Sequence, residues 1–185
     1  MSRAFVALGG NVGGPAARLL AVMGEFDSLP HTRLLRASSL YRTAPVGYAD
    51  QPDFINAVVL LETGLSPDAL MGELLAMETR HGRVRHVRNG PRTLDLDLLL
   101  YDGLVLDGDP ALIVPHPRLH LRSFVLTPLV EIEPECVLPG HGQAASLLER
   151  MTDRDEVRRI DFPGLDDGLQ VLRRLGQGLM PHAYA

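Results

Sequence analysis

Hydrophobic residues follow two different spacings along the first part of this chain, and together the spacings predict six elements. Short apolar runs typical of strands occur at residues 3–8, 32–43, 54–63 and 93–101. Between them, apolar side chains three and four residues apart indicate one helix around 19–26. A second helix is predicted from the N-cap Ser66 to a stop at Gly82. The predicted order is β-α-β-β-α-β.

This order is the split βαβ, or ferredoxin-like, arrangement. We therefore predict an α+β fold with a ferredoxin-like βαββαβ core, an antiparallel sheet with the helices on one face. Further additions follow toward the C-terminus: a short strand at 104–107, helices around 124–132 and 144–151, and a last short strand at 156–162. We expect one domain over residues 1–162 and a partly helical C-terminal extension at 163–185.

Composition narrows the possible chemistry. The 185 residues suit a single domain, and a net charge of −5 gives no reason to expect nucleic acid or membrane as a partner. The single Cys136 excludes internal disulfides and favours a buried thiol in a reducing, cytoplasmic setting. The sequence contains no lysine, which excludes a Walker A lysine, a Schiff base and Ser/Lys catalysis.

The most informative stretch is RNGPRTLDLDLLLYDG at residues 88–103, because it sets two carboxylates into a leucine-rich strand. Side chains alternate along a strand, so Asp95 and Asp97 share the face opposite the leucines, with Cα atoms roughly 6.6–6.8 Å apart. Two such carboxylates repel unless a cation lies between them. Mg²⁺ takes oxygen ligands and commonly uses one or two carboxylates with substrate phosphates. A solvated pair on an open face is the alternative.

The segment RHGRVRHVRNGPR, just before this strand, contains arginines and histidines but no acid. The planar arginine side chain suits phosphate oxygens, although a solvated basic loop is the commoner interpretation of such a run alone. Its position next to the carboxylate pair favours phosphoryl transfer, which depends on positioning and charge neutralisation. Asn56 adds a hydrogen-bonding group on the face of Phe54, as expected beside a flat heteroaromatic ligand or in a structural role.

These motifs resemble the 6-hydroxymethyl-7,8-dihydropterin pyrophosphokinases of folate biosynthesis. RNGPRTLDLDLLLYDG is similar to the family signature, with further matches in ALGGN, SSLYRTAPVG, QPDFINAVVLLET, METRHGRVR and VPHPRLHLRSFVLTPLVEI. The similarity extends over about residues 4–148. It implies a ferredoxin-like fold and a Mg²⁺-dependent transfer of pyrophosphate from ATP to the pterin hydroxymethyl group, with release of AMP.

The resemblance also implies roles for individual residues. Two Mg²⁺ ions would be held by Asp95 and Asp97, and the phosphate charge would be neutralised by Arg83 and Arg92. The matching ATP-binding positions are Glu78, Arg85, Leu98, His116 and Arg122. The matching pterin-pocket positions are Thr43, Val46, Phe54, Asn56 and Phe124, with the two phenylalanines stacking on the ring.

Two other functions stay open from the residues alone. A metal-dependent phosphohydrolase would use the same carboxylates with water as the acceptor. A non-catalytic ligand-binding module would use the same fold without chemistry, although few aromatics and a negative net charge disfavour RNA as its ligand. We expect a monomer acting on ATP and the pterin.

Overall fold

The computed structural model describes residues 1–45, 50–83 and 90–161. Its strands are β1 (Ser2–Gly10), β2 (Thr32–Ala37), β3 (Leu40–Thr43), β4 (Phe54–Thr63), β5 (Asp95–Tyr101), β6 (Leu106–Asp109), β7 (Leu112–Val114), β8 (Val137–Leu138), β9 (Gly142–Gln143) and β10 (Arg158–Ile160). Its α-helices are α1 (Pro15–Glu25), α2 (Pro67–Arg80), α3 (Ser123–Ile132) and α4 (Ala144–Glu149). Short 3₁₀ turns lie at Phe26–Ser28, Leu119–Leu121 and Arg154–Glu156.

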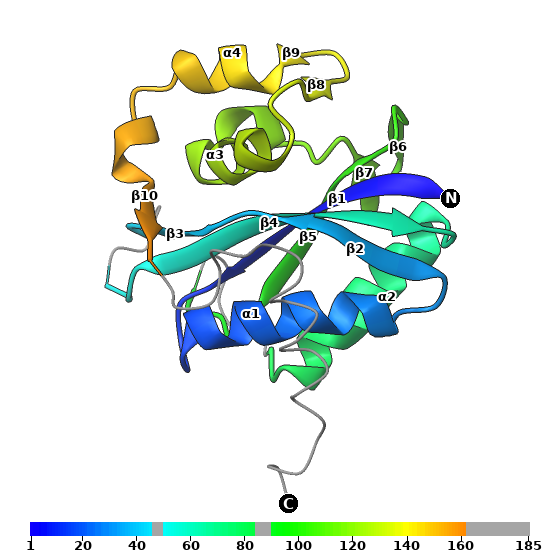
Figure 1. Ribbon diagram of the computed structural model, residues 1–185, viewed down its shortest axis with the longest axis horizontal. Coiled ribbons are helices and arrows are strands. Elements are labelled where there is room, and N and C mark those ends of the chain that lie inside the picture. The colour runs from blue at the N-terminus through cyan, green and yellow to red at the C-terminus, as the bar shows by residue number, and fades with distance from the viewer. Residues whose placement is uncertain (46–49, 84–89, 162–185) are drawn as a thin grey trace, which may run out of the picture.

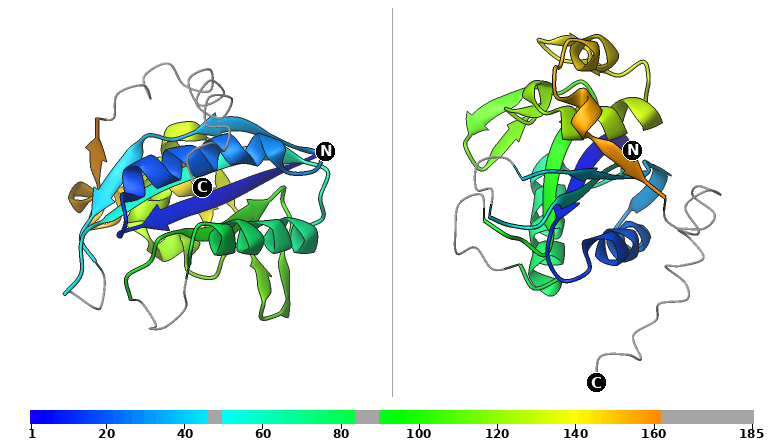
Figure 2. Two further views of the ribbon diagram at one scale, coloured as in Figure 1. Left: turned by 90° about the horizontal axis from the view of Figure 1, so that it is seen from below. Right: turned by 90° about the vertical axis from the view of Figure 1, so that its left-hand side faces the viewer.

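Within these residues, six strands form one antiparallel sheet in the order β10-β3-β4-β1-β5, and β2 also pairs with β4. The helices α1 and α2 lie side by side across one face of this sheet (Figures 1 and 2). Apolar side chains from both helices and from the inner face of the sheet form one core, in which Leu19, Met23, Leu74 and Leu96 are almost fully buried. The predicted mixed fold with an antiparallel sheet is confirmed.

Local signals explain the second helix. The Ser66 hydroxyl accepts a hydrogen bond from the Ala69 N–H at 3.3 Å, and Pro67 takes the first helical position. The helix ends before Gly82, whose φ of +75° lies in the left-handed region that glycine adopts without steric cost. The N-cap and stop predicted from sequence are therefore both confirmed.

The prediction that helices cover one face is incomplete. The helix α3 packs on the opposite face of the sheet, with α4 beyond it (Figure 1). Val125, Leu126 and Leu129 of α3 form a second apolar cluster with Val58 and Leu60 of β4. Because α3 is apolar on most sides, it needs burial against the sheet as well as against α4. Among the described residues, both faces of β4 are thus covered there, and the carboxylate face is open near the Phe54 end.

The strand predicted at 32–43 is interrupted. Its pairing with β4 shifts register between Leu34 and Arg36, and shifts again where β2 gives way to β3. Each extra residue lengthens the spacing between core-facing side chains from two residues to three. Leu34, Ala37 and Leu40 therefore all face the same core. The strand predicted at 104–107 is also displaced, since it lies at 106–109 and pairs with an unpredicted β7.

Strand β5 carries the carboxylates and has one irregularity of its own. Leu94, Leu96 and Leu98 point into the core with α1 and α2, and Asp95 and Asp97 point the other way, as predicted. Beyond Leu98 the pairing with β1 slips by one residue, and the alternation ends there. Leu99 and Leu100 consequently both join the α3 cluster, which closes the carboxylate face at that end.

Candidate active site

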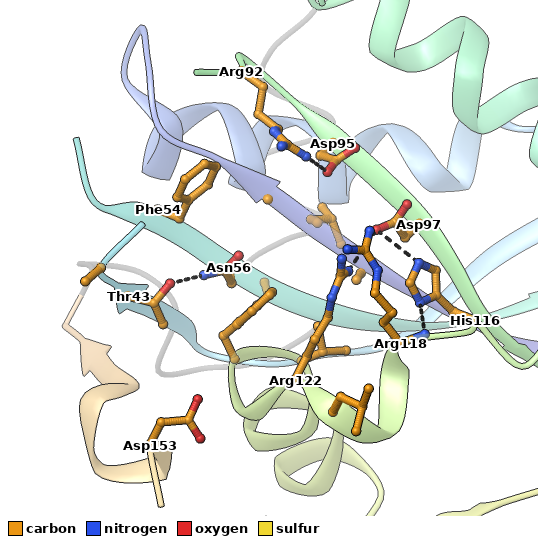
Figure 3. Close-up of a pocket in the computed structure, with 18 of the residues that line it drawn as sticks. Thr43, Phe54, Asn56, Arg92, Asp95, Asp97, His116, Arg118, Arg122 and Asp153 are labelled. Atoms are coloured by element: carbon orange, nitrogen blue, oxygen red, sulfur yellow. Dashed lines mark hydrogen bonds and ion pairs between the residues drawn. The ribbon is translucent and has the colours of Figure 1, made fainter. Parts of the chain in front are cut away.

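A cavity of about 520 Å³ opens on the carboxylate face of the sheet. It lies between β4, β1 and β5 and the start of α3, and Figure 3 shows the polar side chains that face it. Ten residues expected from the sequence line it: Thr43, Phe54, Asn56, Arg83, Arg92, Asp95, Asp97, His116, Arg122 and Phe124. Side chains from distant parts of the chain therefore converge on one cavity.

Asp95 and Asp97 are in different electrostatic surroundings. Asp95 forms ion pairs with Arg83, at 2.5 Å, and with Arg92. The cation paired with Asp97 is farther away, with the Arg122 guanidinium at 3.7 Å, and the His116 Nε2 lies 3.9 Å from the same carboxylate. Burial, together with the negative charge of Asp95, raises the pKa of Asp97 to about 6. Its side chain is still 35% exposed, so a ligand in the cavity can reach it.

This donor set fits Mg²⁺ rather than a metal that needs a complete protein cage. Within residues 1–45, 50–83 and 90–161, no three His, Cys, Asp or Glu side chains come together as a metal cluster. Two carboxylates on one strand face leave most coordination positions for water and phosphate oxygens, as Mg²⁺ prefers. A cation beside Asp97 would also relieve the repulsion that raises its pKa.

His116 faces this end of the cavity as a neutral side chain. Its Nδ1 accepts a hydrogen bond from the Arg118 N–H at 3.2 Å, so the ring proton lies on Nε2, which faces Asp97. Burial, followed by the positive charges of Arg122 and Arg118, lowers the pKa of His116 to about 4. At neutral pH His116 can therefore donate a hydrogen bond from Nε2 to an anionic ligand.

The other end of the cavity combines two rings with a hydrogen-bonded amide. Asn56 is buried, and its Nδ2 donates to the Thr43 hydroxyl at 2.8 Å. The Phe54 ring lies 5.6 Å from the guanidinium carbon of Arg92, and the Phe124 ring lies 5.6 Å from that of Arg122. As expected, Asn56 and Phe54 share one face and line the same cavity. This end suits a planar ligand with polar edges.

Two expected ATP-binding residues do not line this cavity. Glu78 is only 3% exposed and lies beneath β5, where its Oε1 accepts the Leu96 N–H at 2.7 Å and pairs with Arg83. It also borders a smaller neighbouring cavity with Leu75 and Thr79. The Leu98 side chain is buried in the core with α1 and α2, so only its backbone can face a ligand. Val46, Arg85 and the extension at 163–185 lie outside the described residues.

Sequence reasoning missed Arg118, Leu121 and Asp153, which also line the cavity. Arg118 is two residues after His116 in a proline-rich segment, and its charge next to an expected ligand-binding histidine was an available signal. Asp153 reaches the site through a hydrogen bond from the Ser123 hydroxyl at 2.8 Å. No local pattern connects residues thirty positions apart, so Asp153 carried no signal.

Fold and site together define a class: a small α+β protein whose cavity joins a carboxylate and arginine region to an aromatic, amide-bearing end. Comparison with known proteins identifies the family within this class. The model of the 7,8-dihydro-6-hydroxymethylpterin-pyrophosphokinase (HPPK) family matches residues 5–134. A 2-amino-4-hydroxy-6-hydroxymethyldihydropteridine pyrophosphokinase from Pseudomonas aeruginosa is 45% identical over 148 residues, which cover 80% of this chain and 91% of that protein. The chain belongs to the HPPK family.

Other relatives agree. The protein of the same name from Haemophilus influenzae is 40% identical over 158 residues, covering 85% of this chain and 98% of that one. Among solved structures, wild-type Plasmodium falciparum HPPK-DHPS with pterin and p-hydroxybenzoate matches with a TM-score of 0.64 at 13% identity. That match covers 87% of this chain but only 45% of the longer Plasmodium chain, and it supports the fold. No helix in the described part of the chain is long and apolar enough to span a membrane.

Proposed function

We propose that this protein transfers the pyrophosphoryl group of ATP to the hydroxymethyl group of 6-hydroxymethyl-7,8-dihydropterin. The hydroxymethyl oxygen forms a bond to the β-phosphorus, the bond from that phosphorus to the α,β-bridging oxygen breaks, and AMP leaves. The hydroxyl proton passes to Asp97 or to water. One observation carries the proposal: the cavity places the Asp95–Asp97 pair and its arginines beside the ring-binding end formed by Phe54 and Asn56. Family membership supports the same reaction.

Asp95 and Asp97 would hold two Mg²⁺ ions with the phosphate oxygens of ATP. Bound Mg²⁺ supplies neutralisation of the phosphate charge and polarisation of the attacking hydroxyl. When a triphosphate binds, Arg83 and Arg92 can exchange the Asp95 carboxylate for phosphate oxygens, since both are oxygen acceptors that suit the guanidinium fork. That exchange releases Asp95 for the metal and brings both arginines onto the transferred group.

The ring-binding end orients the acceptor. Asn56 would hydrogen-bond to the polar edge of the pterin, with Thr43 holding its amide in place. Phe54 and Phe124 would stack on the ring. Arg122 and His116 would contact the nucleotide phosphates. Val46 would contribute to the pterin pocket and Arg85 to ATP binding. We further propose that Glu78 and the Leu98 backbone contribute to ATP binding, that the core is ferredoxin-like, and that the protein acts as a cytoplasmic monomer.

The test combines the protein with ATP, Mg²⁺ and 6-hydroxymethyl-7,8-dihydropterin, followed by chromatography of the nucleotides. AMP that forms only with the pterin, together with a diphosphorylated pterin, supports the proposal. ADP or free phosphate formed without pterin would instead indicate the phosphohydrolase. Pterin binding without any turnover would indicate a ligand-binding module.

A further inference from the structure

Asn11 is a buried polar residue that the proposed chemistry does not use. It follows β1 and is 3% exposed, and it does not line the cavity. Its Nδ2 donates to the Gln51 Oε1 at 2.9 Å and to the Pro52 carbonyl at 3.0 Å. Its Oδ1 accepts the Arg92 N–H at 2.9 Å, and its own N–H donates to the Arg92 carbonyl at 3.0 Å. One residue thus joins three separate segments of the chain.

The orientation of this amide is determined by its partners. Both Asn11 Nδ2 hydrogens meet oxygen acceptors, and its Oδ1 meets an N–H donor. A flipped amide would place an NH₂ group against the Arg92 N–H, and an oxygen against the Pro52 carbonyl. Only the observed orientation satisfies all the groups, so position 11 needs a donor and an acceptor on one short side chain.

Close backbone contact reinforces this junction. A Cβ at Gly10 would lie 2.6 Å from the Thr93 carbonyl oxygen, so only glycine allows β1 to approach the segment before β5. The Arg18 guanidinium donates to the Val12 carbonyl at 2.9 Å and to the Thr93 carbonyl at 3.4 Å. The segment that leads into Arg92 is therefore held against the end of β1.

Arg92 belongs to the carboxylate and arginine region of the cavity and Phe54 to its ring-binding end. Asn11 hydrogen-bonds to Arg92 itself and to the segment just before Phe54. It holds the Arg92 backbone through two hydrogen bonds, while the Arg92 guanidinium pairs with Asp95 and lies over the Phe54 ring. Gln51 and Pro52 lie three and two residues before Phe54, where β4 begins. We infer that Asn11 is a positioning residue that aligns Arg92 with the segment leading into Phe54, so that the phosphate and ring ends of the site assemble together. This inference rests on the proposed function.

Two variants separate the connections. Asn11→Ala removes all three side-chain hydrogen bonds. Asn11→Asp keeps an acceptor for the Arg92 N–H but places an oxygen against the Pro52 carbonyl. Thr63→Ala is the control, because Thr63 is fully buried and its hydroxyl shares a 2.7 Å hydrogen bond with Thr32. It lies at the far end of β4, about 30 Å along the strand from Phe54.

Steady-state kinetics of pterin-dependent AMP formation is the first measurement. Asn11→Ala should lower kcat by about ten- to a hundredfold, because small misplacement of a charge-neutralising group is costly in rate. Asn11→Asp should keep kcat within about threefold and raise the pterin KM at least about fivefold, because the Arg92 bond survives and the Pro52 bond does not. Thr63→Ala should keep kcat within about twofold. A kcat for Asn11→Ala within twofold of wild type would overturn the inference.

A double-mutant cycle tests whether Asn11 acts through Arg92. In an Arg92→Ala background, Asn11→Ala should reduce kcat by less than about twofold further, because the side chain that it positions is already gone. An equal fold-loss in both backgrounds would show that Asn11 acts by another route.

Hydrogen exchange of the Arg92 amide gives a readout without activity. Exchange should be at least about tenfold faster in Asn11→Ala than in wild type and Thr63→Ala, and close to wild type in Asn11→Asp. Unchanged exchange in Asn11→Ala would overturn the inference. Wild-type protein that makes no AMP would refute the proposed function alone, because the exchange experiment still reports whether Asn11 holds Arg92.

Discussion

Replacing Glu78 should reduce stability strongly, because its carboxylate lies beneath the strand that carries the site. Glu78 is 3% exposed, the side chain of its partner Arg83 is 15% exposed, and Oε1 also accepts the Leu96 N–H between the two aspartates. Removing one partner of a buried ion pair costs about 3–5 kcal/mol, since the remaining charge is uncompensated. With a urea m-value of about 2 kcal/mol/M, Glu78→Ala should lower the unfolding midpoint by about 1.5–2.5 M.

Urea unfolding followed by far-UV circular dichroism measures this loss, because the chain has no tryptophan to report by fluorescence. Glu62→Ala is the matched control: Glu62 pairs with Arg33 at 2.7 Å, but their side chains are 31% and 57% exposed. Such an exposed pair contributes about 0–1 kcal/mol. Equal midpoints for Glu78→Ala and Glu62→Ala would refute the view that Glu78 supports β5 from below.

Three further predictions concern the site and the second core. Arg92→Ala should lower kcat about 10²–10³-fold while the pterin Kd changes less than about threefold, as measured by single-turnover kinetics and calorimetry; an unchanged kcat would contradict its role. Asn56→Ala should weaken pterin binding by about 1–3 kcal/mol in calorimetry and leave the Mg²⁺-ATP Kd unaltered; equal losses for both ligands would argue against a role specific to the ring. Burial and nearby Glu133 raise the pKa of Cys136 to about 11, so alkylation at pH 8 should be about a hundredfold slower in the folded than in the urea-unfolded protein. Equal alkylation rates for the folded and unfolded protein would show that the thiol is exposed. Because this folded-state pKa exceeds the unfolded value of 9.0, the Cys136 contribution to stability is present below pH 9 and is lost as the pH rises toward 11.

Local signals made part of this fold predictable. The caps of α2 and the alternation at Asp95 and Asp97 depend on neighbours in the sequence, and both were confirmed. The register shifts around Leu34 and Ala37 were not predicted, because the pairing of β2 and β3 with β4 determines them. The general lesson is physical: periodicity identifies a strand, but bulges depend on the partner strand.

Contacts between residues far apart in the sequence determine the features of the fold and site that the sequence did not reveal. The apolar pattern of α3 predicted a helix, but its position depends on contacts with distant residues. Glu131 of α3 accepts hydrogen bonds from the Ser39 N–H at 2.8 Å and from the Tyr41 hydroxyl at 3.0 Å, which fixes the helix against β3. In the same way, Asp153 joins the site only because Ser123 begins that helix. Strand alternation singled out Asp95, Asp97 and Asn56, and the family resemblance added further site residues, whereas Asp153 came only from tertiary structure.

The balance of charge in the cavity explains why acids and arginines occur together. Arginines alone would bind any polyphosphate, with or without a metal. Here Asp95 occupies Arg83 and Arg92, so a metal-free triphosphate must displace a carboxylate and then lie beside two uncompensated acids. A triphosphate that arrives with Mg²⁺ satisfies the acids and the arginines at once. The same ion pairs that occupy Arg83 and Arg92 in the resting site therefore favour the metal-bound nucleotide as its ligand.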